Sequence, residues 1–512
     1  MIIKRIMLIF MALILFSALI GCDSSQPAKP ETKAGAAIAE SAGSGEKPMA
    51  EELAYPPVLP EDEEFVEEAH RLTGYLAKGE YKAAIDMFDA VVKNKAGEEA
   101  VWEQTWNRLR KQNGDFVKIG ESVAGRTKEG GQTYVIVHHT LVFARSPLIQ
   151  RSVFNLEGQV AGIFFLPGEV KLDYTKKDRP SKQADSPNQS LPAGLTETEV
   201  TIESQPGYPL QGSLTRPAGP VRAVLLLIPG SGPNDRDETM GPNKPFRDLA
   251  HGLAQKGLAS LRLDKISHSH ALKLASHPDL SRFTVDEEFA IDAVNAFNWL
   301  KKQDDFQGRD IFLLGHSQGG ALVAYINSKG VDAAGYIILS SITRPLWQVQ
   351  YDQNVQLLEE FKAAGRMEEA EDGFKMIEVE AAKARALEGL TEEELLKETV
   401  FGLPAWYVKH LSSIDPPALH LADPKPVLVL HGGRDRQVSL KDFQSWQDGL
   451  KEHPDASFRL YDRLNHLFGD YQGEPVPYSK MVEVEYAQPT PVPQYVIDDI
   501  SEWISGHLTG SN

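Results

Sequence analysis

The pentapeptide Gly-His-Ser-Gln-Gly at residues 315–319 holds a serine in a setting that favours nucleophilic chemistry. The apolar residues 311–314 before it predict a strand, and residues 320–326 after it predict a helix. A serine at a tight strand-to-helix turn is pushed out at the end of its strand, where its hydroxyl can attack a substrate. Gly315 and Gly319 suit such a turn, because any side chain there would crowd it. We therefore predict that Ser317 is a nucleophile.

A serine hydroxyl needs a base that takes its proton and an acid that orients the base. Asp435 lies in a Gly-Gly-Arg-Asp sequence after the apolar run 426–430, which predicts a buried strand. We predict that Asp435 is the acid, although an aspartate in such a sequence can also simply form a turn. His466 follows a predicted strand, 458–461, after a short loop, and is the predicted base.

The oxyanion that forms when a serine attacks a carbonyl needs two backbone N–H donors. Gln318, the residue after the nucleophile, is expected to supply one. The loop after the predicted strand 221–228 reads Pro-Gly-Ser-Gly-Pro-Asn-Asp, and its glycines let the backbone turn an amide toward the site. We expect the second donor to be the amide of Ser231, with Gly232 as the alternative.

The remaining histidines near these motifs favour no metal site. His316 adjoins the nucleophile, and we expect its side chain to point away from the site and pack. Three others, at positions 268, 270 and 277, share a loop, but no carboxylate is arranged with them. We predict neither a metal nor an organic cofactor.

Alternating strands and helices must position these residues. Residues 200–202 and 210–215 predict an opening hairpin, and buried strands are expected at 221–228, 259–264, 311–314, 336–339 and 427–430. Helices are predicted at 245–256, at 285–301 and from 496 to 504. This pattern predicts an α/β fold with a doubly wound, mostly parallel sheet over residues 196–512.

The alternation stops between 341 and about 423, where the sequence is charged and helical and nothing resembles a strand. Because active sites of such folds lie at the carboxyl ends of the strands, we predict a helical cap over the site. A long helical hairpin on the surface is the alternative.

The segments IPGSGPNDRD, LRLDK, GHSQGG, LHGGRDRQV and LNHLF resemble bacterial α/β-hydrolases of the esterase/serine-aminopeptidase-like group, which is related to dienelactone hydrolase. The order Ser317, Asp435, His466 is the order in that fold. The resemblance implies hydrolysis of a carboxylic ester or related acyl bond through an acyl-enzyme. A peptidase or acyltransferase with the same triad, or a binding protein without catalysis, stays an alternative. Pro229 replaces a histidine that many relatives carry, but only backbone is needed there.

The first 22 residues predict a lipoprotein signal peptide. Lys4 and Arg5 precede the apolar run 6–20, and Leu-Ile-Gly-Cys at 19–22 resembles a bacterial lipobox. Cys22, the sole cysteine, is the expected lipidation site, and no disulfide can form within the chain. We expect the protein in the cell envelope, anchored by lipid at the outer face of the cytoplasmic membrane. With an ordinary signal peptide it would be secreted.

Residues 23–60 are polar and small, which predicts a flexible tether. Between 61 and 171, helical stripes precede alternating strands and predict a small α+β domain, followed by a Pro/Ser-rich linker at 172–195. This domain resembles the NTF2-like or cystatin-like accessory domains that precede some hydrolases. It holds no catalytic set, because His138 and His139 are adjacent and point to opposite faces of a strand.

A chain of 512 residues with 42% apolar and 24% charged residues is typical of a globular protein with two or three domains. Its formal net charge of −19 argues against nucleic acid and against an anionic membrane surface as partners. The expected partner is a small acyl ester or peptide-like substrate, and the membrane is contacted through the lipid anchor. The sequence indicates no particular protein partner.

Overall fold

The computed structural model describes residues 54–55, 62–129, 132–167, 170–172, 191–275, 277 and 279–509. These residues form two compact units, one with the described residues up to 172 and a larger one with those from 191 onward. The predicted signal peptide with Cys22, nearly all of the tether and most of the linker lie outside the described residues. Among the helices described, none combines the length and apolar character that a membrane span requires.

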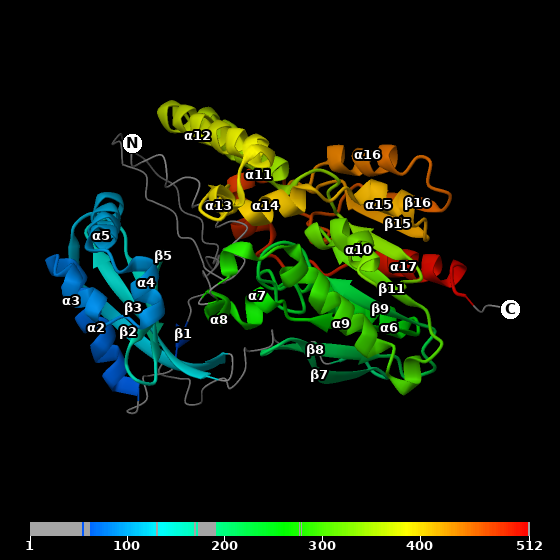
Figure 1. The fold of residues 1–512 in the computed structure, drawn as a ribbon, viewed down its shortest axis with the longest axis horizontal. Coiled ribbons are helices and arrows are strands. Elements are labelled where there is room, and N and C mark those ends of the chain that lie inside the picture. Colours follow the sequence, from blue (N-terminus) through cyan, green and yellow to red (C-terminus); the bar gives the residue numbers. More distant parts are fainter. Residues whose placement is uncertain are drawn as a thin grey trace, which may run out of the picture. The chain divides into compact units, whose positions relative to one another are not determined.

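A sheet of eight strands organises the larger unit, in the order β16-β15-β12-β11-β9-β10-β8-β7 (Figure 1). From β16 to β10 the neighbours pair in parallel, and β8 and β7 add an antiparallel hairpin at one edge. The predicted mostly parallel sheet with its opening hairpin is therefore confirmed. The strands are β7 Thr196–Gln205, β8 Tyr208–Arg216, β9 Ala223–Ile228, β10 Leu258–Leu263, β11 Ile311–His316, β12 Tyr336–Leu339, β15 Val427–Gly432 and β16 Ala456–Tyr461.

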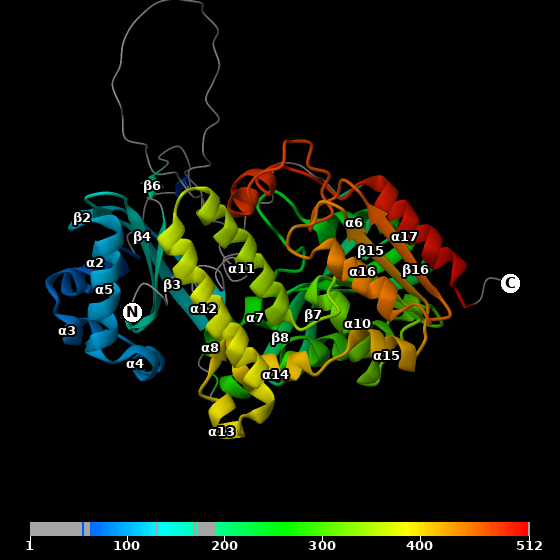
Figure 2. The ribbon, with the colours of Figure 1, turned by 90° about the horizontal axis from the view of Figure 1, so that it is seen from above.

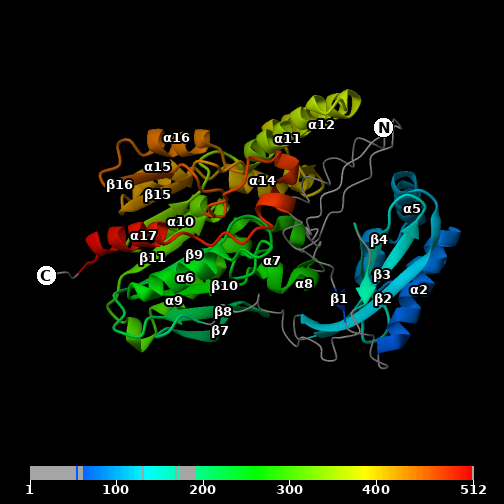
Figure 3. The ribbon, with the colours of Figure 1, turned by 180° about the vertical axis from the view of Figure 1, so that it is seen from behind.

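Helices cover both faces of this sheet, because its central strands are apolar on both sides. Alternate residues of β9 pack into two separate cores, one on each face. One face is covered by α9 (Ile291–Leu300), α10 (Gln318–Ser328) and α16 (Leu440–Gly449) (Figure 1). The other is covered by α6 (Pro245–Gln255) and α17 (Gln494–Gly506) (Figure 3). Strands buried on both faces are typical of parallel sheets.

The insertion between β12 and β15 is helical, as predicted, and has its own apolar core. Its helices are α11 Leu346–Ala363, α12 Met367–Ala386, α13 Glu392–Leu395, α14 Ala405–Ser412 and α15 Pro416–Ala422. The long helices α11 and α12 lie side by side (Figure 2). The expectation that it contains no strand is wrong: β13 (Thr399–Val400) and β14 (Leu403–Pro404) form an antiparallel pair. Two-residue strands are too short to leave an alternating pattern in the sequence.

Helices pack against an antiparallel sheet in the smaller unit, as its sequence predicts. The sheet order is β2-β3-β4-β5, with β2 Phe116–Glu129, β3 Gln132–Phe143, β4 Leu148–Asn155 and β5 Val160–Pro167. The helices are α2 Glu63–Lys78, α3 Tyr81–Asp86, α4 Ala90–Ala96 and α5 Glu99–Asn113. The unit also uses two residues of the predicted tether, because β1 (Ala54–Tyr55) pairs with β6 (Lys171–Leu172).

One further difference from the sequence prediction concerns local geometry. The helix predicted at 285–301 begins as a π-helical turn, Asp286–Ala290, before α9. Such turns inside helices are rare and frequently occur at functional sites.

The turn between β11 and α10 has no room for side chains at its glycines. Ser317 has a φ of 52° and a ψ of −122°. A Cβ atom at Gly315 would lie 2.5 Å from the carbonyl oxygen of Gly319. A Cβ atom at Gly319 would lie 2.3 Å from the carbonyl oxygen of Ile228, at the end of β9. The prediction that side chains would crowd this turn is confirmed.

We expect Gly319→Ala to lower the free energy of unfolding by about 2–3 kcal/mol, because the added methyl group can only be relieved by moving backbone. Urea denaturation of the purified protein measures this loss. Gly389→Ala is the matched control, since a Cβ atom there meets nothing within 4 Å. Equal stability of the two variants would contradict the packing described for the turn.

Candidate active site

The predicted nucleophile is the one partly exposed residue in an otherwise buried turn. Ser317 follows β11 directly and is the N-cap of α10. Its backbone N–H donates to the carbonyl of Leu339 at 2.8 Å, and its carbonyl accepts a hydrogen bond from Ser341 Oγ at 2.6 Å. Residues 311–316 and 318–320 are buried, whereas Ser317 is of intermediate exposure. The turn thus holds the serine backbone firmly and presents its side chain.

The predicted acid and base form a buried pair. Asp435 follows β15, His466 follows β16, and Asp435 Oδ2 lies 2.7 Å from His466 Nδ1. The other carboxylate oxygen, Oδ1, accepts the backbone N–H groups of Gln437 and Val438 at 2.8 and 2.9 Å. Burial by itself raises the pKa of Asp435, but His466 and these hydrogen bonds outweigh it, and the net pKa is lowered. An ionised Asp435 can hold the His466 imidazole with its Nδ1–H toward the acid and its Nε2 free for a proton.

The helical insertion braces the loop that carries the acid. Gln353 and Gln356 on α11 donate side-chain hydrogen bonds to the carbonyls of Gln437 and Arg436, at 3.0 and 3.1 Å. These two carbonyls belong to the residues directly after Asp435. The predicted cap therefore contributes to the site by fixing the acid loop.

The loop after β9 lies against the nucleophile. A Cβ atom on Gly230 would come within 3.0 Å of Ser317 Cβ. The amide of Gly230 is already engaged, because it donates to Glu238 Oε1 at 2.5 Å. In the described part of the chain, the next amide, that of Ser231, donates to no protein group. Gln318 is the first residue of α10, so its amide has no partner within the helix. Both predicted oxyanion donors are thus unengaged.

Glu238 and His316 form a second buried pair, which the sequence prediction missed. His316 Nδ1 lies 2.9 Å from Glu238 Oε2, and His316 Nε2 donates to the carbonyl of His466 at 2.8 Å. Burial by itself lowers the pKa of His316, but the Glu238 carboxylate and the carbonyl of His466 outweigh it, and the net pKa is raised. The ring of His316 packs against Phe246 and His466, as expected, but it does not point away from the site, because it also supports the backbone of the predicted base.

Glu238, the carboxylate of this pair, has a positive φ of 52°. Such strain in a residue other than glycine persists only where the surroundings impose it, and it clusters at functional sites. The sequence carries no comparable signal, because a glutamate in a polar loop is ordinary.

Other residues considered in the sequence do not form a second site. His268 Nδ1 lies 3.3 Å from the carbonyl of Pro233, and His270 Nε2 lies 2.8 Å from that of Pro209. His277 packs against the ring of Phe283. Within the described residues no group of three or more His, Cys, Asp or Glu side chains is arranged to hold a metal ion.

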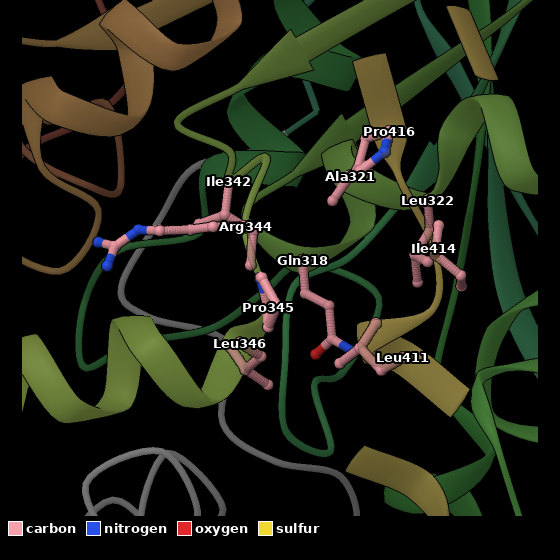
Figure 4. Close-up of a pocket in the computed structure, with 10 residues that line it drawn as sticks. All are labelled: Gln318, Ala321, Leu322, Ile342, Arg344, Pro345, Leu346, Leu411, Ile414 and Pro416. Atoms are coloured by element: carbon pink, nitrogen blue, oxygen red, sulfur yellow. The ribbon is translucent and has the colours of Figure 1, made fainter. Parts of the chain in front are cut away.

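A small apolar pocket adjoins the residue after the nucleophile (Figure 4). Gln318 points into it, as do residues from the start of α11 and the end of α14 (Figure 4). Arg344, the one charged residue of its lining, is neutralised by Asp442 at 2.6 Å and Asp352 at 2.6 Å. The full lining is Gln318, Ala321, Leu322, Ile342, Arg344, Pro345, Leu346, Leu411, Ile414 and Pro416. Its lining is mainly apolar, and its cavity volume of about 10 Å³ is room for about one water molecule.

Comparison with known families gives two matches along the chain. Residues 210–476 match the Alpha/beta hydrolase family. Residues 69–163, in the smaller unit, match a family described as a protein of unknown function, DUF3887.

Esterase EstD of Thermotoga maritima is 31% identical to this chain over 441 residues, which cover 86% of this chain and 95% of that protein. A match of this length extends beyond the larger unit into the smaller one. Among solved structures, a Pyrococcus furiosus esterase is 14% identical and matches 61% of this chain and 92% of its own with a TM-score of 0.39. Dienelactone hydrolase from Anabaena variabilis is 18% identical and matches 62% of this chain and 99% of its own with a TM-score of 0.35.

The raised pKa of His316 predicts a pH-dependent contribution to stability. A histidine whose folded pKa exceeds the ordinary 6.5 binds its proton more tightly when folded, so its contribution is complete below pH 6.5 and is lost as the pH rises through the raised value. We expect the protein to be more stable than its Glu238→Gln variant, by a margin that is largest below pH 6.5 and shrinks above it. Denaturant titrations at a series of pH values measure the margin.

Glu199→Gln is the control, because Glu199 is an exposed partner of Arg236. Its margin should be small and should not change across the same pH range. A Glu238→Gln margin that is equally independent of pH would contradict the assignment of the charge pair.

Proposed function

Because the chain belongs to the alpha/beta hydrolase family, we propose that it is a carboxylesterase-like serine hydrolase with Ser317, His466 and Asp435 as its catalytic triad. The observation that carries this proposal is the buried Asp435–His466 pair at 2.7 Å. The histidine of this pair accepts, at its backbone carbonyl, a hydrogen bond from His316, the residue before the partly exposed Ser317 on its strained turn. The name of the Thermotoga relative, an esterase, supports an ester as the substrate.

In the proposed reaction, Ser317 Oγ attacks the ester carbonyl while His466 Nε2 accepts the hydroxyl proton. The charge that develops on the carbonyl oxygen is stabilised by the amides of Gln318 and Ser231. His466 then gives its proton to the departing alcohol, and the acyl group stays on Ser317. A water molecule, deprotonated by His466, attacks the acyl-enzyme, and the returned proton restores the Ser317 hydroxyl as the acid is released. Asp435 stabilises the imidazolium in both halves.

The apolar side chains beside Gln318 support a substrate with a small apolar group close to the ester bond, for which the small cavity between them would have to widen. A free carboxylate or phosphate would find no unpaired cation there, because Arg344 is already held by two aspartates. Burial of each methylene group in such a pocket contributes about 0.8 kcal/mol. We therefore propose simple esters of apolar acids or alcohols as the substrate class.

Loss of the triad should abolish ester hydrolysis without unfolding the protein. We expect Ser317→Ala to lower the rate by about 10⁴-fold or more, and Asp435→Asn by up to about 10⁴-fold, because the asparagine stabilises the wrong imidazole tautomer. Hydrolysis of p-nitrophenyl esters measures the rate, and circular dichroism checks the fold.

Ser328→Ala and Asp462→Asn are matched controls, since both side chains are exposed. They should keep the full rate. Turnover by Ser317→Ala at the rate of Ser328→Ala would rule out the assignment of the nucleophile.

We also propose that the mature protein is a lipoprotein of the cell envelope and that its smaller unit is an NTF2-like accessory domain. The first proposal is supported by the lipobox-like sequence that ends at Cys22. Helices packed on a four-stranded antiparallel sheet support the second.

Cys22→Ala should move the protein from the membrane fraction to the soluble or precursor fraction. A cysteine that carries two or more acyl chains anchors a protein stably, whereas one chain is marginal. Fractionation and mass spectrometry of the mature N-terminus measure this. An unmodified Cys22 in the mature protein would end the lipoprotein proposal.

A further inference from the structure

A chain of polar groups, buried except for the partly exposed Glu288, connects the Gly230–Ser231 peptide to the side chain of Gln318. Lys265 Nζ donates to the carbonyl of Gly230 at 3.1 Å and to Glu288 Oε1 at 2.8 Å. The other oxygen of Glu288 accepts the hydroxyl of Tyr407 at 2.6 Å. That hydroxyl in turn accepts Gln318 Nε2 at 2.7 Å. We call Lys265, Glu288 and Tyr407 the relay.

The contact from Lys265 decides which way the Ser231 amide points. In a trans peptide the carbonyl oxygen and the N–H group point in opposite directions. Lys265 therefore pulls the Gly230 carbonyl to one side and turns the Ser231 N–H to the other. Asn234 Nδ2 donates to the same carbonyl at 3.1 Å, and the backbone N–H of Lys265 donates to the carbonyl of Asn234. The peptide is thus held from the side away from its N–H.

The other end of the relay acts on the second donor. Gln318 supplies its backbone amide to the proposed hole, and its side chain is held by Tyr407. Tyr407 lies on α14, in the helical insertion, 119 positions after Glu288 in the sequence. Only when α14 packs on the sheet does its hydroxyl complete the chain of hydrogen bonds.

Burial makes these contacts strong. The side chain of Lys265 is 3% exposed, and its ammonium group lies 3.9 Å from the centre of the Phe289 ring. Burial, together with the adjacent Glu288 carboxylate, raises the pKa of Tyr407 well above its ordinary value, so the hydroxyl keeps the proton that it donates. A buried charge without its partner is costly, so Lys265 and Glu288 hold each other in place. Glu288 lies in the π-helical turn Asp286–Ala290, which supports a functional role for that irregularity.

We infer that Lys265, Glu288 and Tyr407 are positioning residues that fix both amides of the oxyanion hole, and that Tyr407 makes the geometry of the hole depend on the packing of the insertion. This inference rests on the proposed function of Ser317 and goes beyond it. The relay touches neither Ser317 nor the triad pair. Its effect is therefore expected in the stabilisation of the transition state, where the oxyanion carries its full charge.

Tyr407→Phe tests the relay with the smallest change, because it removes one hydroxyl and keeps the ring. We expect kcat for a p-nitrophenyl ester to fall about 10-fold with KM changed less than about twofold, which is a smaller loss than removal of a direct oxyanion donor. Amide hydrogen exchange, followed by mass spectrometry on the segment 229–234, should become faster. A role in folding alone would lower the melting temperature instead.

Tyr351→Phe is the matched control, because its hydroxyl donates to Glu378 elsewhere in the insertion. It should leave kcat and the exchange of segment 229–234 unchanged. If Tyr407→Phe behaved like Tyr351→Phe in both measurements, the inference would be overturned. Hydrogen exchange needs no catalysis, so it tests the relay even if the protein hydrolyses no ester. Absence of ester hydrolysis would count against the proposed function alone.

A double-mutant cycle with Lys265→Met gives a second test. Lys265 and Tyr407 do not share a hydrogen bond and are connected through Glu288. If they act through one relay, the loss of kcat in the double variant should be clearly smaller than the product of the two single losses. Multiplicative losses would show two independent effects and would contradict the relay.

Discussion

The left-handed backbone of Ser317 is the constraint on which the rest of the larger unit depends. A residue other than glycine at a φ of 52° and a ψ of −122° costs on the order of 1–3 kcal/mol, so its surroundings must impose the conformation. Here the end of β9 approaches the start of α10 so closely that Gly319 has no room for a Cβ atom. The apolar strands and the helices on both faces fix that approach. Core packing thereby places a partly exposed serine at the end of a strand.

Ionisable groups, all buried except the partly exposed Glu288, surround this turn, and each is paired with a group from a different segment. Asp435 pairs with His466, Glu238 with His316, and Lys265 with Glu288. Pairs of this kind add little net stability, since the cost of removing both charges from water offsets their attraction. Their contribution is to hold the surrounding backbone and side chains in fixed positions. Two of the pairs reach the loop after β9 through Gly230, and the third orients the proposed base.

The sequence predicts the parts of this site that depend on local pattern. The glycines around Ser317, the strand before Asp435 and the order of the three triad residues are all local or ordinal features. The relay is different, because Tyr407 lies 119 positions after Glu288, and nothing in a single sequence indicates that two such distant residues are in contact. For the same reason the pairing of His316 with Glu238 could not be predicted. The π-helical turn that contains Glu288 could not be predicted either, because its apolar spacing is that of an ordinary helix start.

The most direct measurement of the central claim is a crystal structure of the protein after reaction with a p-nitrophenyl alkylphosphonate. The phosphonyl group mimics the tetrahedral intermediate, and its oxygen occupies the oxyanion position. We expect a single covalent bond from phosphorus to Ser317 Oγ, with that oxygen within about 2.7–3.1 Å of the amide nitrogens of Gln318 and Ser231. An unmodified Ser317, or a phosphonyl oxygen that points to solvent and away from both amides, would contradict the account.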